Sequence, residues 1–272
     1  MSRAALLAAL SCANFESELA PLRSLFHARP AEPAPAAQPV RTEFPLIDGA
    51  GMDAVFCGNR VAGDLYDAVR VSPQRILFGL LDVAGRREDN RGILANVQKI
   101  FRTLGTELFA PPDINESDAM TELCHVLNRG VIEAANGVRS CPAFICCYNE
   151  EQGTLCYTNA GHTPGLLRDA AGILELTSTG LPLGLFSHAT NDAPTVGVSK
   201  GAVLLLVSRG LVEAEGKNGK VEDLQFGLER VKKQLEDTES HDPHEICVAI
   251  VDPVADQLTH EDRTALVFMR QA

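Results

Sequence analysis

The sequence has no tryptophan, and aromatic residues make up only 5% of its 272 positions. Basic residues are also in the minority, because 24 Lys and Arg face 36 Asp and Glu and leave a net charge of −12. Proteins that bind nucleic acids gather Lys and Arg against the phosphates. This sequence has no basic run of that kind, so we expect no nucleic-acid partner.

Long apolar runs are missing as well. A membrane-spanning helix needs about 18 or more apolar residues in succession, and no stretch of this sequence approaches that length. The apolar residues 4–10 follow a single basic residue, Arg3, which is too little for an export signal. We therefore expect no membrane span and a cytoplasmic location.

The eight cysteines form no C-x-x-C pair, and no Cys/His spacing is typical of a zinc site. Several of them lie in apolar runs such as residues 144–147, where a free cysteine behaves as a small hydrophobic residue. We interpret them as buried thiols in a reducing compartment.

A Pro- and Ala-rich stretch at residues 29–40 divides the chain. Such a stretch is typical of an extended, semi-rigid linker, and we place the linker at residues 29–44. The segment before it, residues 1–28, has Phe15, Leu19, Leu22 and Phe26 at the spacing of an amphipathic helix. An isolated helix of this length is marginal, so we expect it to pack on the main domain or to form a homodimer.

The main domain, residues 45–272, shows alternating signals for strands and helices. The cluster of strands around two central helices favours a layered α+β sandwich over a parallel doubly wound sheet. Ser117 or Asp118 is the expected N-cap of the second helix. The expected strands are 75–83, 141–148, 153–159, 202–208 and 264–270, and the expected helices are 90–108, 118–135 and 226–235.

Acidic residues stand at strand ends or in turns at three places in this domain: Asp64, Asp82, and the pair Glu261 and Asp262. Each alone is typical of a turn or a cap. Together, converging carboxylates would repel one another and would need a cation. Oxygen ligands without paired His or Cys favour Mg²⁺ or Mn²⁺.

Six segments, taken in order, resemble the motifs of one protein family. Its members carry G-G-D-x-Y-D, G-D-V-S-G-K-G, N-A-G-H-x-P, G-x-P-L-G-L, T-D-G-L-x-E and D-D-x-T. No single motif would be specific, but six in the right order are. The matching residues here are 62–67, 81–87, 159–164, 180–185, 208–213 and 261–264. The sequence thus resembles the SpoIIE-like branch of the PPM metal-dependent Ser/Thr protein phosphatases.

The resemblance implies a four-layer α-β-β-α sandwich, preceded here by the N-terminal helical extension. It also implies one or two Mn²⁺ or Mg²⁺ ions that activate a water against a phosphoserine or phosphothreonine. If the family's roles are carried over, Asp64 binds one metal ion and Asp82 bridges both ions. The backbone carbonyl of Val83 assists in binding the metal. Asp262 or Glu261 closes the second site, and the sequence leaves open which; Asp64, Asp82 and Asp262 are the expected catalytic residues.

One residue of this sequence departs from the family pattern. Arg209 stands where the family has the aspartate of T-D-G, and a guanidinium cannot coordinate a metal. We hypothesise that Arg209 takes the place of the second metal and pairs with Asp82 and with residues 261–262. The alternative is that Arg209 points to solvent.

Three further residues leave two interpretations open. Arg86 and Arg87 either bind the substrate phosphate or belong to a solvated loop that ends in the helix cap Asp89, and we favour the loop. His162 is either a general acid or, as we favour, a structural hydrogen-bonding residue.

The resemblance suggests a phosphatase of a bacterial-type partner-switching system. Its substrate would be a phosphorylated regulatory protein such as an anti-sigma-factor antagonist. The alternative is an inactive pseudophosphatase that binds a partner protein, because loss of a metal ligand weakens charge stabilisation at close range.

Overall fold

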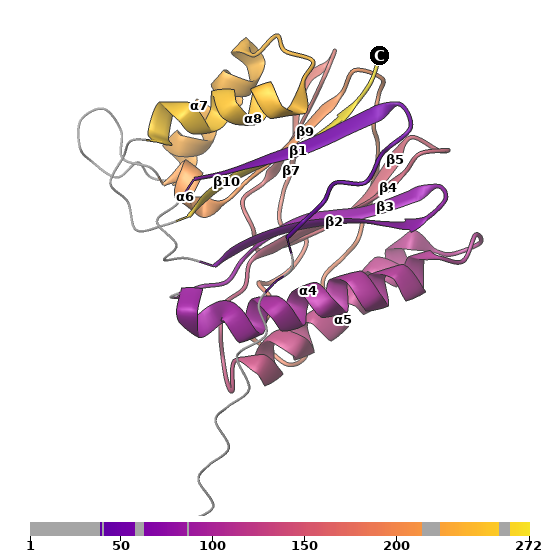
Figure 1. Ribbon diagram of the computed structural model, residues 1–272, viewed down its shortest axis with the longest axis vertical. Helices are drawn as coiled ribbons and strands as arrows, with labels where there is room; N and C mark the ends of the chain where they lie inside the picture. The colour runs from indigo at the N-terminus through magenta and orange to yellow at the C-terminus, as the bar shows by residue number, and fades with distance from the viewer. Residues whose placement is uncertain (1–38, 40, 58–62, 86, 214–223, 256–261) are drawn as a thin grey trace, which may run out of the picture. The chain divides into compact units, whose positions relative to one another are not determined.

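The computed structural model describes residues 39, 41–57, 63–85, 87–213, 224–255 and 262–272. These residues belong to one compact unit, residues 37–272. Two antiparallel sheets lie face to face in this unit, and helices cover the outer face of each, as Figure 1 shows. The four layers, α-β-β-α, are those expected from the sequence. The segment 1–28, for which we predicted a helix, lies outside the described residues.

The first sheet carries two residues of the candidate site, Asp64 and Asp82. Its strand order is β2-β3-β4-β5-β8. Strand β3, between β2 and β4, reads RILFGLLD, and every residue but the last is buried. A strand covered on both faces needs such a continuous apolar run rather than alternation. The strands are β2 (Asp64–Ser72), β3 (Arg75–Asp82), β4 (Ala143–Asn149), β5 (Thr154–Ala160) and β8 (Thr195–Gly197).

The second sheet has the order β1-β10-β9-β6-β7. Strand β10 lies between β1 and β9, and all but its last residue are buried. The apolar layer between the two sheets includes Phe78 and Phe268, whose rings stack at 5.4 Å between centroids. The strands are β1 (Ala50–Cys57), β6 (Gly165–Asp169), β7 (Gly172–Leu176), β9 (Val203–Val207) and β10 (Arg263–Arg270).

Two long helices, α4 (Arg87–Phe109) and α5 (Glu116–Ala134), cover the first sheet side by side (Figure 1). Their apolar faces form one core with that sheet. A second core joins the other sheet to α6 (Arg209–Val212), α7 (Leu224–Asp237) and α8 (Pro243–Ala255). Each helix layer therefore buries its apolar face against one sheet, which is the usual way to satisfy both elements.

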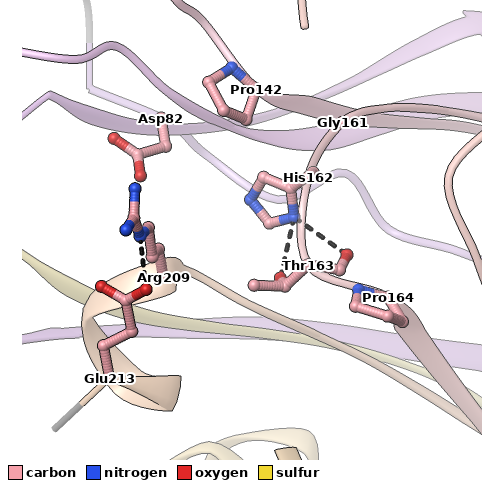
Figure 2. Close-up of a pocket in the computed structure, with 8 residues that line it drawn as sticks. All are labelled: Asp82, Pro142, Gly161, His162, Thr163, Pro164, Arg209 and Glu213. Atoms are coloured by element: carbon pink, nitrogen blue, oxygen red, sulfur yellow. Dashed lines mark hydrogen bonds and ion pairs between the residues drawn. The ribbon is translucent and has the colours of Figure 1, made fainter. Parts of the chain in front are cut away.

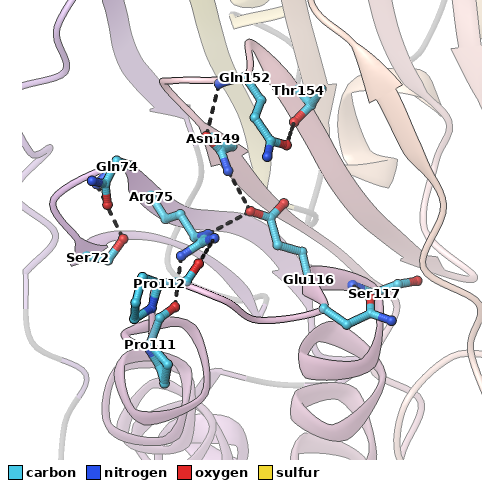
Figure 3. A network of polar contacts seen from close by, with 11 residues as sticks. Ser72, Gln74, Arg75, Pro111, Pro112, Glu116, Ser117, Asn149, Gln152 and Thr154 are labelled. Carbon is cyan, nitrogen blue, oxygen red and sulfur yellow. Dashed lines mark hydrogen bonds and ion pairs between the residues drawn. The ribbon is translucent and has the colours of Figure 1, made fainter.

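A polar network fixes the end of the first sheet that lies away from the candidate site (Figure 3). Arg75, at the start of β3, donates to Glu116 at 2.6 Å and to the carbonyls of Pro111 and Pro112. Asn149, at the end of β4, donates to the same Glu116 oxygen at 2.8 Å. The network joins the α4–α5 connection to two strands and leaves none of these groups buried without a partner.

Most of the predicted elements are confirmed, with ends that differ by a few residues. The N-cap of α5 was predicted wrongly, because Asn115, and not Ser117 or Asp118, accepts from the amides of Ser117 and Asp118. The predicted helix cap Asp89 is also wrong, since α4 already begins at Arg87. Helix α8 was missed. Its Pro253 and the acidic residues around it interrupt the pattern that signals a helix.

The cysteines follow the prediction in the part of the chain that the structure describes. Cys57 is half-buried, and the six others are buried free thiols. Burial raises the pKa of the Cys124 thiol to about 12, so the thiol stays protonated. No helix among the described residues is long and apolar enough to cross a membrane.

Candidate active site

Two of the predicted site residues come together on one hairpin. Asp64 is the first residue of β2 and Asp82 is the last residue of β3, and the two are direct partners in the antiparallel register. Side chains of directly opposed residues point to the same face of a sheet, with Cβ atoms about 5 Å apart. Asp64 was expected in a turn; it lies instead in a strand, and the strand register sets its distance from Asp82.

The Asp64 carboxylate lies in a buried and negative environment. Thr264, in β10 of the other sheet, donates its hydroxyl to Asp64 at 2.6 Å. Burial raises the pKa of Asp64 well above its usual range, and the charges of Asp82 and Asp262 raise the pKa further. The hydrogen bond from Thr264 opposes that rise. A cation placed among these three carboxylates would relieve their repulsion.

Asp262 lies at the entry to β10 and is 3% exposed. Its carbonyl accepts from the Ser208 hydroxyl at 3.2 Å, and the amide of Thr264 donates to that hydroxyl at 2.9 Å. These bonds hold the end of β9 against the start of β10, and they use the Ser208 hydroxyl for structure. Glu261, the other predicted ligand, lies outside the described residues.

The Val83 carbonyl is held in place at the end of β3. Asn90, near the start of α4, donates its side-chain amide to this carbonyl at 2.8 Å and to the Gly85 carbonyl at 3.2 Å. Gly63 approaches the same carbonyl so closely that a Cβ there would lie 2.1 Å from it. The role of Asn90 was not predicted, because a helical position alone does not show where its side-chain amide points.

Arg209 is the first residue of the short helix α6. Its side chain is 62% exposed, and its Nε pairs with Glu213 at 2.7 Å. Figure 2 shows the guanidinium pointing toward the Asp82 carboxylate on one side of a pocket that both residues line. The structure therefore places Arg209 beside Asp82. We did not predict the partner Glu213, although it lies one helical turn after Arg209 in the sequence.

His162 lies on the opposite wall of this pocket (Figure 2). It is 7% exposed, and the edge of its ring faces Phe144. Its amide donates to the side chain of Asn159 at 2.8 Å, and Gly161 next to it has φ of 67°, which a glycine adopts without strain. Burial lowers the pKa of His162 to about 4, so the ring is neutral at pH 7.

The described residues do not present a complete metal cage. Among them, no three His, Cys, Asp or Glu side chains are grouped so that they could hold a metal ion. The two carboxylates at the hairpin end and the Val83 carbonyl are hard oxygen donors, and these suit Mg²⁺ or Mn²⁺. Arg86 lies outside the described residues. Arg87 opens α4, and its side chain is not among those described.

Comparison with known proteins agrees with this fold. The family model for Stage II sporulation protein E (SpoIIE) matches residues 72–271. A curated relative, "Phosphoserine phosphatase RsbP" of Bacillus subtilis, is 24% identical over 174 residues, which cover 63% of this chain and 42% of RsbP. The chain therefore spans less than half the length of this relative.

Solved structures share the architecture at low sequence identity. The RsbU and RsbW domains of Rv1364c from Mycobacterium tuberculosis match with a TM-score of 0.69 and 19% identity, over 84% of this chain and 63% of that one. The PP2C phosphatase domain of SpoIIE from Bacillus subtilis matches with a TM-score of 0.64 and 15% identity. The match covers 81% of this chain and 63% of that one. Together with the six motifs and the paired aspartates, the family match shows that this chain belongs to the SpoIIE family, the SpoIIE-like branch of the PPM phosphatases.

Proposed function

We propose that this chain is a metal-dependent phosphoserine and phosphothreonine protein phosphatase with a degenerate second metal site. One observation carries the proposal: Asp64 and Asp82 are paired at the end of one hairpin, with Asp262 close to Asp64. In a member of the SpoIIE family, such a cluster of carboxylates is a site for a divalent cation.

Asp64, Asp82 and the Val83 carbonyl would hold one Mn²⁺ or Mg²⁺ ion, and Asp262 lies close enough to add its charge. Such an ion supplies a bound water of low pKa and offsets negative charge on the phosphoryl oxygens. The protein's part is to hold the carboxylates in place. Thr264 fixes Asp64, and Asn90 fixes the Val83 carbonyl.

Arg209 takes the place of the second ion in this proposal. The direction of its guanidinium toward Asp82 (Figure 2) supports that role, because a fixed positive charge there offsets the carboxylates without a metal. Metal titration by calorimetry tests the proposal. We expect one tight Mn²⁺ site in the unmutated protein and a second one in Arg209→Asp, whereas two tight sites before mutation would contradict it.

Hydrolysis of para-nitrophenyl phosphate with Mn²⁺ tests whether the chain is an enzyme. We expect a measurable rate that Asp82→Ala abolishes. The alternative is a pseudophosphatase that binds its partner and does not hydrolyse it. The exchange of a family ligand for Arg209 favours this alternative, and the absence of any rate in a folded, metal-loaded protein would establish it.

The partner would be a phosphorylated regulatory protein of a partner-switching system in the cytoplasm, such as an anti-sigma-factor antagonist. Support comes from the similarity to RsbP and to the RsbU and RsbW domains. The test is incubation of the chain with such an antagonist in its phosphorylated form, followed by separation of the two forms on a phosphate-affinity gel. Loss of the phosphorylated band only with Mn²⁺ is the expected result.

A further inference from the structure

Exposed apolar side chains gather in two loops, residues 136–142 and 180–190. In the part of the chain that the structure describes, six large apolar side chains are exposed, and three of them lie in these loops. The three are Val138, Leu181 and Phe186, with exposed fractions of 49–77%. Single apolar residues scattered over a surface are normal, whereas a group of them marks a place where another molecule binds.

Backbone hydrogen bonds join the two loops to each other. The amide of Arg139 donates to the Gly184 carbonyl at 3.3 Å. Cys141 and Leu183 exchange both of their amide-to-carbonyl bonds, at 2.9 and 3.0 Å. The exposed apolar side chains therefore stand on adjoining stretches of backbone, although more than 40 positions separate the two loops in the sequence.

Helix α5 anchors the second loop. The buried side chain of Asn128 accepts from the Gly184 amide at 2.7 Å and donates to the Phe186 carbonyl at 2.9 Å. Gly184 has φ of 83°, and a Cβ there would collide with the Arg139 carbonyl. The backbone that carries Phe186 is thus fixed before any partner binds, and a pre-organised surface loses less conformational entropy on binding.

Both loops border the pocket beside Asp82. Pro142 of the first loop and Gly161 line this pocket (Figure 2). The ring of Pro182, in the second loop, packs so closely on Gly161 that a Cβ there would collide with it. A protein is far larger than a pocket of about 250 Å³. A protein partner that reaches this pocket must therefore also rest on the surface around it, and these loops form part of that surface.

The loops are not acidic, although the chain as a whole is. The net charge of the chain is −12, yet residues 136–142 and 180–190 contain one Arg, one His and no Asp or Glu. The acidic residues that flank the loops are Glu133, which pairs with an arginine one turn earlier in α5, and Asp192. An acidic partner therefore meets less repulsion at these loops than the net charge of the chain would give.

Arg139 places the positive charge of the loops next to the end of β3. Its Nη1 donates to the Ala84 carbonyl at 3.1 Å, and this contact uses one of the five N–H groups of the guanidinium. The next loop residue, Ser140, accepts from the Ala84 amide at 2.9 Å. A carboxylate of a partner that covers the apolar side chains could therefore bond to the other N–H groups of Arg139.

We infer that residues 136–142 and 180–190 form a docking face for the segment of the partner protein that flanks its phosphorylated residue, and that this segment carries apolar and acidic side chains. The inference rests on the proposed function for the phosphorylated partner, and it adds where the partner is held and by which chemistry. Apolar side chains of the partner cover Leu181 and Phe186, and an acidic one pairs with Arg139.

A set of synthetic peptides tests the inference. Each peptide carries one phosphoserine analogue with a methylene group in place of the bridging oxygen, so that no turnover occurs. Two Leu and one Glu stand three to eight positions away on either side, and matched peptides have Ala or Gln in their place. Fluorescence anisotropy with the full chain and Mg²⁺ measures the affinities.

At the spacing that fits the face, we expect the Leu peptide to bind about threefold to tenfold more tightly than its Ala counterpart. Glu should add about twofold to fivefold over Gln, as an exposed ion pair does. If no spacing gives a preference for Leu, or if no peptide binds, the inference is overturned.

Variants of the loops assign the preferences to individual side chains. Leu181→Ser and Phe186→Ser should abolish the preference for Leu, and Arg139→Gln should abolish the preference for Glu alone. The matched control is Leu174→Ser, which removes an exposed leucine of the edge strand β7, outside both loops. These three apolar side chains are exposed, so their loss should leave thermal unfolding nearly unchanged. Preferences that persist in the loop variants would contradict the docking face.

Two further measurements separate this inference from its alternatives. Light scattering reports whether Phe186→Ser lowers the mass of the chain in solution; a lower mass would mean that a second copy covers the face, and would overturn the inference. Phosphate release from the ordinary phosphoserine peptides with Mn²⁺ tests the proposed function. A preference for Leu without any release would contradict that function alone, and equal release from Leu and Ala peptides that bind equally would contradict the docking face alone.

Discussion

The two aspartates of the motif at residues 62–67 have different tasks. Successive residues of a strand point to opposite faces, so Asp64 and Asp67, three apart in β2, face different sides of the sheet. Asp64 faces the candidate site. Asp67 is 1% exposed and receives two hydrogen bonds of 2.7 Å from Arg102 of α4. One short motif thus supplies a site residue and a contact between the sheet and its helix layer.

We predict that Asp67→Asn lowers the free energy of unfolding by about 1–3 kcal/mol, because the buried carboxylate loses its charge while Arg102 remains beside it. Urea unfolding measures the change. The control is Glu133→Ala, which removes a pair with Arg129 in which both side chains are more than 60% exposed; exposed pairs of this kind contribute little. A similar loss in both variants would show that Asp67 has no special role.

His162 should make stability depend on pH. Its pKa is about 4 in the folded protein because burial disfavours the charged ring, whereas an unfolded chain binds this proton near pH 6.5. Between these values the unfolded state holds more protons, so stability falls as the pH decreases from about 6.5 toward 4, by roughly 3 kcal/mol in all.

Chemical unfolding of the native chain and of His162→Asn at several pH values checks this prediction. The difference in unfolding free energy between the two proteins should shrink steadily from pH 7 to pH 4.5. Comparing the two also cancels the opposite contribution of Asp64, whose raised pKa favours the folded state at low pH. A difference that stays constant with pH would mean that His162 titrates normally.

At the level of whole elements, α7 holds α6 in place. Gly227 of α7 lies so close to the Val212 carbonyl that a Cβ there would be 1.7 Å away. Arg230, one turn later, donates to the Leu211 carbonyl at 2.5 Å. The position of α6, and with it the position of Arg209, therefore depends on a glycine contact with a neighbouring helix.

We expect Gly227→Ala to lower the free energy of unfolding by about 1–3 kcal/mol, because the rigid carbonyl of Val212 cannot yield without a shift of α6. The matched control is Gly92→Ala in α4. A Cβ at Gly92 meets no atom within 4 Å, and alanine there should stabilise the helix by about 0.5–1 kcal/mol. Thermal unfolding of both variants measures the effects, and a neutral Gly227→Ala would refute the proposed contact.

The elements with the most uniform burial were those predicted best from the sequence. Strands β3 and β9 are continuous apolar runs, and α4 and α5 have clear apolar faces, so their patterns stand out. Short strands such as β8, with three residues, carry too few positions to form a pattern. The cap of α5 was missed for a different reason. Asn, Ser and Asp are almost equivalent N-caps, so only the side-chain hydrogen bonds of Asn115 could identify it.

For the whole molecule, a homodimer through the amphipathic segment 1–28 remains a prediction from the sequence. If Phe15, Leu19 and Phe26 form its apolar face, Leu19→Asp should convert the dimer into a monomer, since a charge in an apolar interface is costly. Light scattering after size exclusion over a range of concentrations measures the mass. The matched control is Ser17→Asp, because a helix of this spacing would place residue 17 opposite the apolar face. The same monomeric mass for all three proteins would contradict the prediction.

The site as a whole was only partly accessible from the sequence. The motifs named Asp64, Asp82 and Asp262, and in the structure the charges of Asp82 and Asp262 both raise the pKa of Asp64. Their supporting contacts come from residues distant in the chain. The bond from Thr264 to Asp64 spans 200 positions, and no local pattern encodes it. The pocket formed by His162 and Arg209 likewise depends on how the two sheets pack, which a single sequence does not show.

The pair between Arg209 and Glu213 has a consequence for the local stability of α6. The family pattern T-D-G-L-x-E has an aspartate and a glutamate at these two positions, and two like charges four residues apart repel each other by a few tenths of a kcal/mol. An arginine turns that repulsion into the 2.7 Å pair seen here. The variant Arg209→Asp, which would restore a metal ligand, therefore also loses this attraction, and its helix α6 should be slightly less stable until a metal ion binds.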